Sequence, residues 1–196
     1  MKTFSKQLSN KQQSGFTLIE MIVTVTIAAI LASIAIPSFT KMIERNRIST
    51  GTNEFLSALI LARSEAVKRS MQVTVCSSTN QTSCSTSTDF AKGWIIFPDW
   101  DGDKVINTTK TRDTNGDGTL DMSEKDAIIK VHEALPQLSI VSTTANTKAI
   151  RYERSGRVKN TMTINIGKKA STPSKQIDIS LTGRVKSCKA GTSGGC

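Results

Sequence analysis

One apolar segment constrains the fold more than any other feature of the sequence. Residues 16–36 form a run of 21 residues in which Glu20 is the one charged side chain. At about 1.5 Å per residue, a helix of this length crosses the hydrocarbon core of a bilayer. The preceding residues contain Lys2, Lys6 and Lys11 but no acid, and such positive charge favours the cytoplasmic side of a membrane. The sequence therefore predicts a single-pass membrane helix with its N-terminus in the cytoplasm and the rest of the chain outside.

Glu20 needs an explanation of its own, because a carboxylate at mid-membrane costs about 2.5 to 3.5 kcal/mol on insertion scales. A cation that could meet it is the α-amino group created by cleavage between Gly15 and Phe16. The sequence at this point reads Gly15-Phe16-Thr17-Leu18-Ile19-Glu20, and Pro37 follows the apolar run. This arrangement resembles the type IV pilin and pseudopilin superfamily.

The resemblance implies a prepilin leader over residues 1–15, which prepilin peptidase would remove, and a transmembrane and assembly helix over 16–37. Phe16 would become the N-methylated first residue, Glu20 would pair with the terminal amine of a neighbouring subunit, and Pro37 would kink the helix. The expected location is the inner membrane of a Gram-negative bacterium, with a periplasmic C-terminal domain, and the pilus or pseudopilus after assembly. An ordinary secretory signal cut near Ala35 and a plain membrane anchor are the alternatives. Neither accounts for Glu20 or the Gly–Phe junction.

The chain beyond Pro37 predicts an α+β fold. Apolar residues such as Phe55, Leu59 and Ala66 recur at three- and four-residue steps, which indicates an amphipathic helix over residues 38–70. Residues 71–196 are expected to form an antiparallel β domain, with strands at 72–76, 94–97, 128–133, 138–142, 149–153, 158–166 and 176–181. Apolar residues alternate with polar ones in 161–166 and 176–181, and their isoleucine face should lie on the long helix. The superfamily's pilin fold, a long membrane-spanning helix packed on an antiparallel β-sheet, has this design.

Four cysteines fall in the segment predicted to be exported, as the pairs Cys76/Cys84 and Cys188/Cys196. An even count in an exported chain indicates disulfides, and local pairing is the simplest of three connectivities. Free thiols are one alternative. Metal ligation is another, although the spacings are not those of zinc sites and His132 is the one histidine.

Later motifs resemble the GspH/FimT branch of minor pilins. They are residues 62–66, 73–76, 93–97 with the Asp-rich loop that follows, and 179–185. The resemblance implies a minor pilin that assembles with other major and minor pilins in a type IV pilus or at its tip, and that binds double-stranded DNA in natural transformation. The alternative is a type II secretion pseudopilin that acts in protein export.

Residues 113–124 fit the calcium-loop pattern D-x-[DN]-x-[DN]-G-x5-E. The ligands would come from Asp113, Asn115, Asp117, Thr119, Asp121 and Glu124. No amphipathic helix precedes the loop and no second loop pairs with it, so an isolated Ca²⁺ site of about 10⁻⁴ to 10⁻³ M is expected. Its role would be to hold the insertion at 99–124 in shape. The alternative is an Asp/Asn/Gly-rich turn that binds nothing, and the shorter stretch 99–103 is itself predicted to be a turn.

Most of the net charge of +10 lies near the C-terminus, where residues 148–196 contain eleven basic and two acidic side chains. In DNA-uptake members of the resembling family a G-R-x-R motif contacts DNA, and here residues 183–186 read Gly-Arg-Val-Lys. The lysine keeps the charge but lacks the planar fork of arginine. Salt-sensitive, sequence-independent DNA binding is expected from a mobile, Gly-rich basic tail at 183–196. The candidate residues are Arg184, Lys186, Lys189, Lys168 and Lys169.

Other uses of this basic surface stay open. It could be a solvated face, or it could meet anionic lipid or an acidic neighbouring subunit. Catalysis is not expected, because the sequence has no Gly-rich phosphate loop of the G-x-x-x-x-G-K type and no metalloprotease motif. The lone His132 is predicted to be structural.

Overall fold

The computed structural model describes residues 15–106, 127–191 and 196. The chain divides into two compact units, residues 1–43 and 44–196. Helix α1 (Leu18–Arg69) contributes its first part to one unit and its second part to the other. Every other helix or strand that the structure describes belongs to the second unit.

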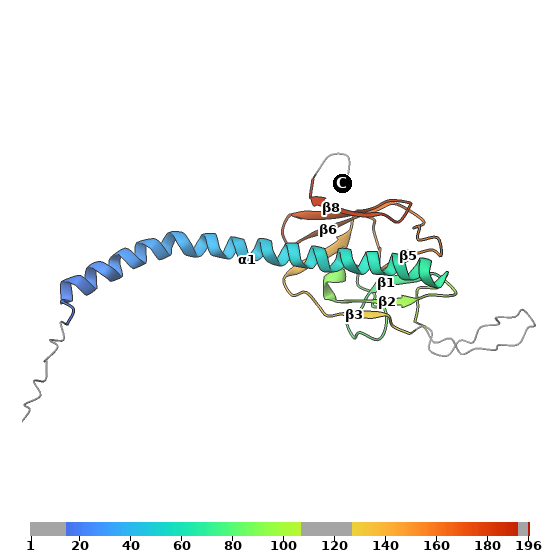
Figure 1. Ribbon diagram of the computed structural model, residues 1–196, viewed down its shortest axis with the longest axis horizontal. Coiled ribbons are helices and arrows are strands. Elements are labelled where there is room, and N and C mark those ends of the chain that lie inside the picture. The colour runs from blue at the N-terminus through green and yellow to red at the C-terminus, as the bar shows by residue number, and fades with distance from the viewer. Residues whose placement is uncertain (1–14, 107–126, 192–195) are drawn as a thin grey trace, which may run out of the picture. The chain divides into compact units, whose positions relative to one another are not determined.

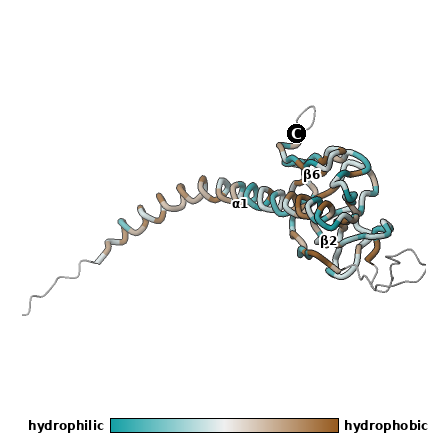
Figure 2. The backbone as a smooth tube through the Cα atoms, turned by 45° about the vertical axis from the view of Figure 1, so that its right-hand side comes forward, coloured by the Kyte–Doolittle hydropathy of each residue, from teal (hydrophilic) through white to brown (hydrophobic). Residues whose placement is uncertain are grey.

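The first part of α1 is a continuous helix that includes Pro37. Its apolar side chains from Leu18 to Ile36 are exposed all round, and Figure 2 shows this hydropathy along the tube. The mean hydropathy reaches 2.4 over an 18-residue window, so the helix is long and apolar enough to cross a membrane. A helix that is apolar on every face needs lipid or other protein around it. The predicted long apolar helix is confirmed.

Among the described residues, the second unit contains two antiparallel sheets of four strands each (Figure 1). The first has the order β3-β2-β1-β5, and its strands are β1 (Val73–Ser77), β2 (Trp94–Pro98), β3 (Lys130–His132) and β5 (Ala149–Tyr152). The second has the order β4-β6-β7-β8, and its strands are β4 (Leu138–Ser142), β6 (Met162–Lys168), β7 (Lys175–Ile179) and β8 (Val185–Lys189). A short 3₁₀ helix, η1 (Phe90–Lys92), precedes β2.

The second part of α1 and both sheets share one hydrophobic core. The helix contributes a buried stripe that contains Phe55, Leu59 and three alanines, and the small alanines allow the sheets to approach closely. Phe55 contacts the rings of Phe90 and Trp94, with both centroids 5.2 Å away. The alternating isoleucines of β6 and β7 belong to the same cluster: Ile164, Ile166, Ile177 and Ile179. The predicted packing of this isoleucine face on the helix is confirmed.

A smaller apolar cluster lies around Cys76, Ile95 and Phe97, with Ile106 and Ile128 packed against it. Cys76 forms a disulfide with Cys84, and Cys188 forms one with Cys196. The structure therefore has the local pairing, and none of its described cysteines is free.

The structure differs from two of the predictions for the second half of the β domain. Residues 185–189 were predicted to belong to a mobile tail, but they form β8 and pair with β7 from Val185↔Ile179 to Lys189↔Lys175. β8 is an edge strand, and Val185 is its one apolar residue packed on the core. Its sequence therefore has no alternation of apolar and polar residues from which the strand could be predicted. The strand predicted at 158–166 was also misplaced, since β6 begins at Met162 and extends to Lys168.

Candidate functional site

The start of α1 places the processing and assembly residues. Gly15 and Phe16 precede the helix and are exposed, with Phe16 84% exposed. Thr17 acts as the N-cap, since its Oγ1 accepts a hydrogen bond of 3.3 Å from the Glu20 backbone N–H. The Gly15–Phe16 peptide therefore lies outside the helix and is exposed.

Glu20 is the third residue of the helix and the acidic residue of its first turn. With Thr17 it makes the T-x-x-E pattern of a capping box, in which the acid also complements the helix dipole. Sequence analysis missed this local role, although the spacing of Thr17 and Glu20 would have revealed it. The hydrogen bond to Thr17 comes from the Glu20 backbone, so a variant at Glu20 can keep it and changes the charge of the first turn together with the predicted pairing with another subunit.

Arg63 connects α1 to two turns of the β domain. Its Nε donates a hydrogen bond of 3.1 Å to the Gly156 carbonyl, and its Nη2 donates one of 3.0 Å to the Thr182 carbonyl. The two turns touch, because a Cβ built on Gly183 would lie 1.9 Å from the Gly156 oxygen. Gly183 also has φ of +74°, which favours glycine. The glycine of the Gly-Arg-Val-Lys motif is thus required by the fold.

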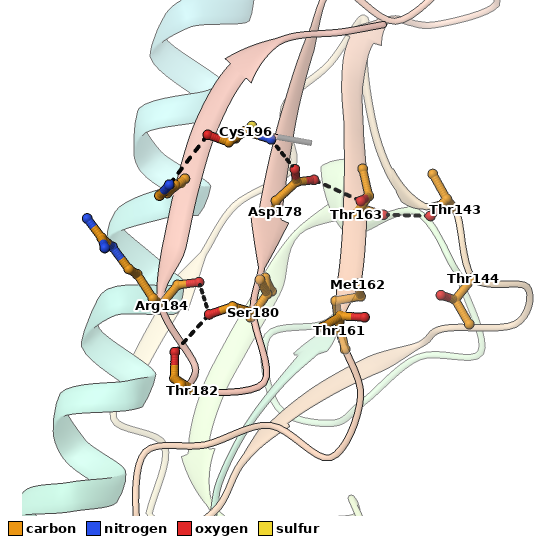
Figure 3. A pocket seen from close by; sticks show the side chains of 12 residues that line it. Thr143, Thr144, Thr161, Met162, Thr163, Asp178, Ser180, Thr182, Arg184 and Cys196 are labelled. Carbon is orange, nitrogen blue, oxygen red and sulfur yellow. Dashed lines mark hydrogen bonds between the residues drawn. The ribbon is translucent and has the colours of Figure 1, made fainter. Parts of the chain in front are cut away.

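The basic residues Arg184 and Lys186 line one cleft of about 780 Å³ on the second sheet (Figure 3). Its other lining residues include residues of β6, of β7 and of the segment that follows β4. Hydroxyl side chains dominate the rest of the lining: Thr143, Thr144, Thr161, Thr163, Ser180 and Thr182. Asp178 lies among them and accepts hydrogen bonds from Thr163 Oγ1, at 2.8 Å, and from the Cys196 backbone N–H. The cleft can therefore bind an anion or a polar group through hydroxyls and two cations.

The other residues predicted to bind DNA lie elsewhere on this sheet. Lys186 pairs in register with Asp178, which pairs with Thr163, whereas Lys168 is five residues further along β6, about 17 Å at the rise of a strand. The Lys168 ammonium also lies 3.5 Å from the Glu44 carboxylate. Lys169 follows Lys168 and is exposed. Lys189 lies opposite Lys175 at the far end of β8. The structure thus brings together two of the five predicted residues.

His132 is a structural contact, as its isolation in the sequence suggested. Its ring stacks on Trp94 with centroids 3.8 Å apart, and its Nε2 lies 3.5 Å from the Glu54 carboxylate. These contacts connect β3 to β2 and α1. The candidate calcium ligands Asp113, Asn115, Asp117, Thr119, Asp121 and Glu124 lie outside the described residues, so that site stays a prediction.

Family comparison agrees with the fold and with the start of the helix. The family model described as type II transport protein GspH matches residues 51–183, and the prokaryotic N-terminal methylation motif matches residues 10–36. The chain belongs to the GspH family. The methylation motif contains the Gly15–Phe16 junction and Glu20. The resemblance to type IV pilins and pseudopilins is therefore confirmed.

Two fimbrial proteins of Pseudomonas aeruginosa are each 33% identical to this GspH-family chain over 112 residues, which are 57% of the chain and 67% of each relative. The type IV minor pilin FimU of the same species superposes with a TM-score of 0.50 at 19% identity, covering 73% of the chain and 89% of FimU. The minor pseudopilin EpsH of Vibrio cholerae gives a TM-score of 0.43 at 14% identity, covering 74% and 99%. The FimU likeness shows the pilin fold, and the family is one of structural subunits.

Proposed function

We propose that this GspH-family chain is a minor pilin of a type IV pilus, a structural subunit that acts in pilus assembly or at the tip. The observation that carries the proposal is the 33% identity to two fimbrial proteins across two thirds of their length. The exposed apolar helix with a methylation motif supports it, because such a helix can exchange lipid for the packed interior of a fibre.

The proposed mechanism begins with cleavage after Gly15 by prepilin peptidase at the inner membrane, with the β domain in the periplasm. Cleavage frees the Phe16 amine, which is then methylated. The Glu20 carboxylate, in the first turn of α1, pairs with the terminal amine of a neighbouring pilin and sets the register between subunits. In an apolar interior a charge pair is more favourable than an unpaired charge, because the Coulombic attraction offsets part of the desolvation penalty.

Three variants at Glu20 separate pairing from capping. Glu20→Gln keeps a side chain that can cap the helix but removes the charge, Glu20→Asp keeps the charge, and Glu20→Ala removes both. We expect Glu20→Gln and Glu20→Ala to be processed normally but to be depleted at least tenfold from sheared pili, with Glu20→Asp less affected. Immunoblots of membrane and pilus fractions measure both steps. Incorporation of Glu20→Gln at the wild-type level would contradict the proposed pairing.

The second candidate is a type II secretion pseudopilin that acts in protein export, and the family description, type II transport protein GspH, favours it. Deletion of the gene, with twitching, transformation and exoprotein secretion scored separately, discriminates the two. If the chain is a minor pilin, deletion of its gene should abolish twitching and leave secretion intact. A secretion defect with normal twitching would decide for the pseudopilin.

DNA is a further proposed partner. Of the five basic residues predicted to contact it, we propose Arg184 and Lys186, because these two line the same cleft. Two cations beside many hydroxyls suit a phosphate backbone and would bind it without reading bases. The double variant Arg184→Ala/Lys186→Ala should weaken retention of duplex DNA in a low-salt gel shift, and Lys168→Ala/Lys169→Ala is the matched control with equal loss of charge. Equal weakening by both variants would show general electrostatics in place of a site.

A further inference from the structure

The loop that follows β2 gathers three acidic residues, Asp99, Asp101 and Asp103. One carboxylate oxygen from each lies within 4.8 Å of the others. Three like charges at this separation repel one another strongly unless a cation or protons intervene. Sequence analysis predicted a simple turn here, because the stretch lacks the glutamate that completes a calcium loop.

Asp99 distinguishes this cluster from an ordinary acidic turn. The residue is fully buried, at 0% exposure. Its Oδ2 accepts hydrogen bonds from Thr74 Oγ1 at 2.7 Å and from the Lys104 backbone N–H at 3.2 Å. Its Oδ1 is also buried but has no hydrogen-bond partner in the part of the chain that the structure describes. A buried carboxylate oxygen without a partner is destabilising, and burial correspondingly raises the pKa of Asp99.

The loop is held in one conformation by the first sheet. Arg151 on β5 donates a hydrogen bond from Nη1 to the Gly102 carbonyl. Gly102 has φ of +76°, and a Cβ there would lie 2.6 Å from Gln72 Oε1 and 2.8 Å from Arg151 Nη1. The glycine thus allows the loop to fold closely over Gln72 and Arg151. Asp101 and Asp103 are placed by the same backbone path, so the three carboxylates converge before any ligand binds.

We propose that Asp99, Asp101 and Asp103 bind a divalent cation, and that Ca²⁺ is the ion they accept. Carboxylate oxygens are the ligands that hard cations prefer. The ion would supply a partner for Asp99 Oδ1, which has none among the described residues, and would reduce the repulsion among the three carboxylates. Three side chains are few for Ca²⁺, so water completes the coordination and the affinity falls at about 10⁻⁴ to 10⁻³ M, as in extracellular modules.

This site is separate from the loop predicted at 113–124, and the experiment must distinguish the two. The full-length protein in detergent is titrated with Tb³⁺, whose luminescence is sensitised by a nearby indole, and Trp100 lies between two of the proposed ligands. Ca²⁺ competition then gives the Ca²⁺ affinity, and Mg²⁺ is run in parallel. Thermal unfolding with and without CaCl₂ provides a second readout that is independent of luminescence.

Two double variants decide the assignment. Asp101→Asn/Asp103→Asn removes two charges but keeps oxygens that can accept the loop hydrogen bonds from the Asp103 and Val105 N–H groups. We expect it to weaken Ca²⁺ binding at the Trp100-sensitised site at least tenfold. Asp117→Asn/Glu124→Gln disables the other predicted loop and should retain that binding at the wild-type level.

The proposal is overturned by either of two results. One is an Asp117→Asn/Glu124→Gln protein that shows no Trp-sensitised Tb³⁺ signal and no stabilisation by CaCl₂. The other is an Asp101→Asn/Asp103→Asn protein that binds Ca²⁺ as wild type does. Unfolding temperatures in EDTA confirm that each variant is folded. The result for the Asp117→Asn/Glu124→Gln protein can be interpreted even if the Asp101→Asn/Asp103→Asn protein does not fold.

Discussion

Substitution of Gly183 by alanine tests the contact between the turns that contain Gly156 and Gly183. Two energies oppose the alanine. An L-residue at φ of +74° costs about 1 to 2 kcal/mol, and the new Cβ would lie 1.9 Å from the Gly156 carbonyl oxygen and 3.2 Å from Arg63 Nε. Because the carbonyl belongs to backbone, the turn must move, and Arg63 would then lose its hydrogen bonds to Gly156 and Thr182. Hydrogen bonds to a charged group contribute about 1.5 to 3 kcal/mol each, so the total loss is about 4 kcal/mol or more.

Gly191 is the matched control. It has φ of +81°, and no described residue lies within 4 Å of a Cβ built on it, so Gly191→Ala tests the backbone cost of about 1 to 2 kcal/mol. Thermal unfolding of the full-length protein in detergent, followed by near-ultraviolet circular dichroism, compares the two. At about 2 to 4 °C per kcal/mol for a unit of this size, Gly183→Ala should lower Tm by about 10 °C or more, and Gly191→Ala by a few degrees. Equal shifts for the two variants would refute the argument from the turn contact.

Three further substitutions test single interactions. Tyr152→Phe should leave stability unchanged or raise it by up to about 1 kcal/mol, because the buried hydroxyl has no hydrogen-bond partner among the described residues; a clear drop in Tm would indicate a partner for that hydroxyl. Glu65→Gln should cost about 0.3 to 0.5 kcal/mol at neutral pH. The hydrogen bond from Arg69 lowers the pKa of Glu65, so this contribution is present above the usual value of 4.5 and is lost as pH falls through the folded pKa. The Tm difference from wild type should therefore shrink as the pH falls through the folded pKa of Glu65, and a difference that stays constant over the acid range would show that packing, and not charge, is responsible. Cys76→Ala/Cys84→Ala opens a bridge between residues eight apart, which by loop entropy costs about 2.5 kcal/mol; denaturant midpoints of oxidised wild type and variant measure it, and coincident midpoints would count against that figure.

Periodic features could be predicted from the sequence because they are local. The apolar run from residue 16 and the alternating isoleucines Ile164, Ile166, Ile177 and Ile179 each carry the period of their own element, and the structure confirms the long apolar helix and the packing of these isoleucines on it. The cap at Thr17 was equally local and could have been found from its spacing to Glu20. By contrast, β8 lacks a pattern because an edge strand with one core-facing residue has no alternation to display.

Tertiary contacts account for what the sequence did not show. The burial of Asp99 depends on how the chain after β2 folds over Gln72 and Arg151, so the stretch 99–103 resembles any exposed acidic turn until the sheet is formed. The contact between Gly156 and Gly183 joins residues that are 27 positions apart, and nothing in either turn indicates the other. The acidic cluster and the glycine pair can therefore be recognised only in the folded structure, where the sheets bring the separate segments together.

The same contact changes how the Gly-Arg-Val-Lys stretch should be interpreted. Gly183 is required by its φ angle and by the Gly156 carbonyl, and Val185 packs on the core, so two of the four positions are explained by the fold. Arg184 and Lys186 are exposed and line the cleft, where Lys186 Nζ donates a hydrogen bond of 3.5 Å to the Cys196 carbonyl. The motif's spacing thus follows from a turn that leads into an edge strand, in which alternate side chains point to the same face. Loss of DNA retention in a Gly183 variant would consequently report a damaged turn, whereas only variants at Arg184 and Lys186 can report on the surface itself.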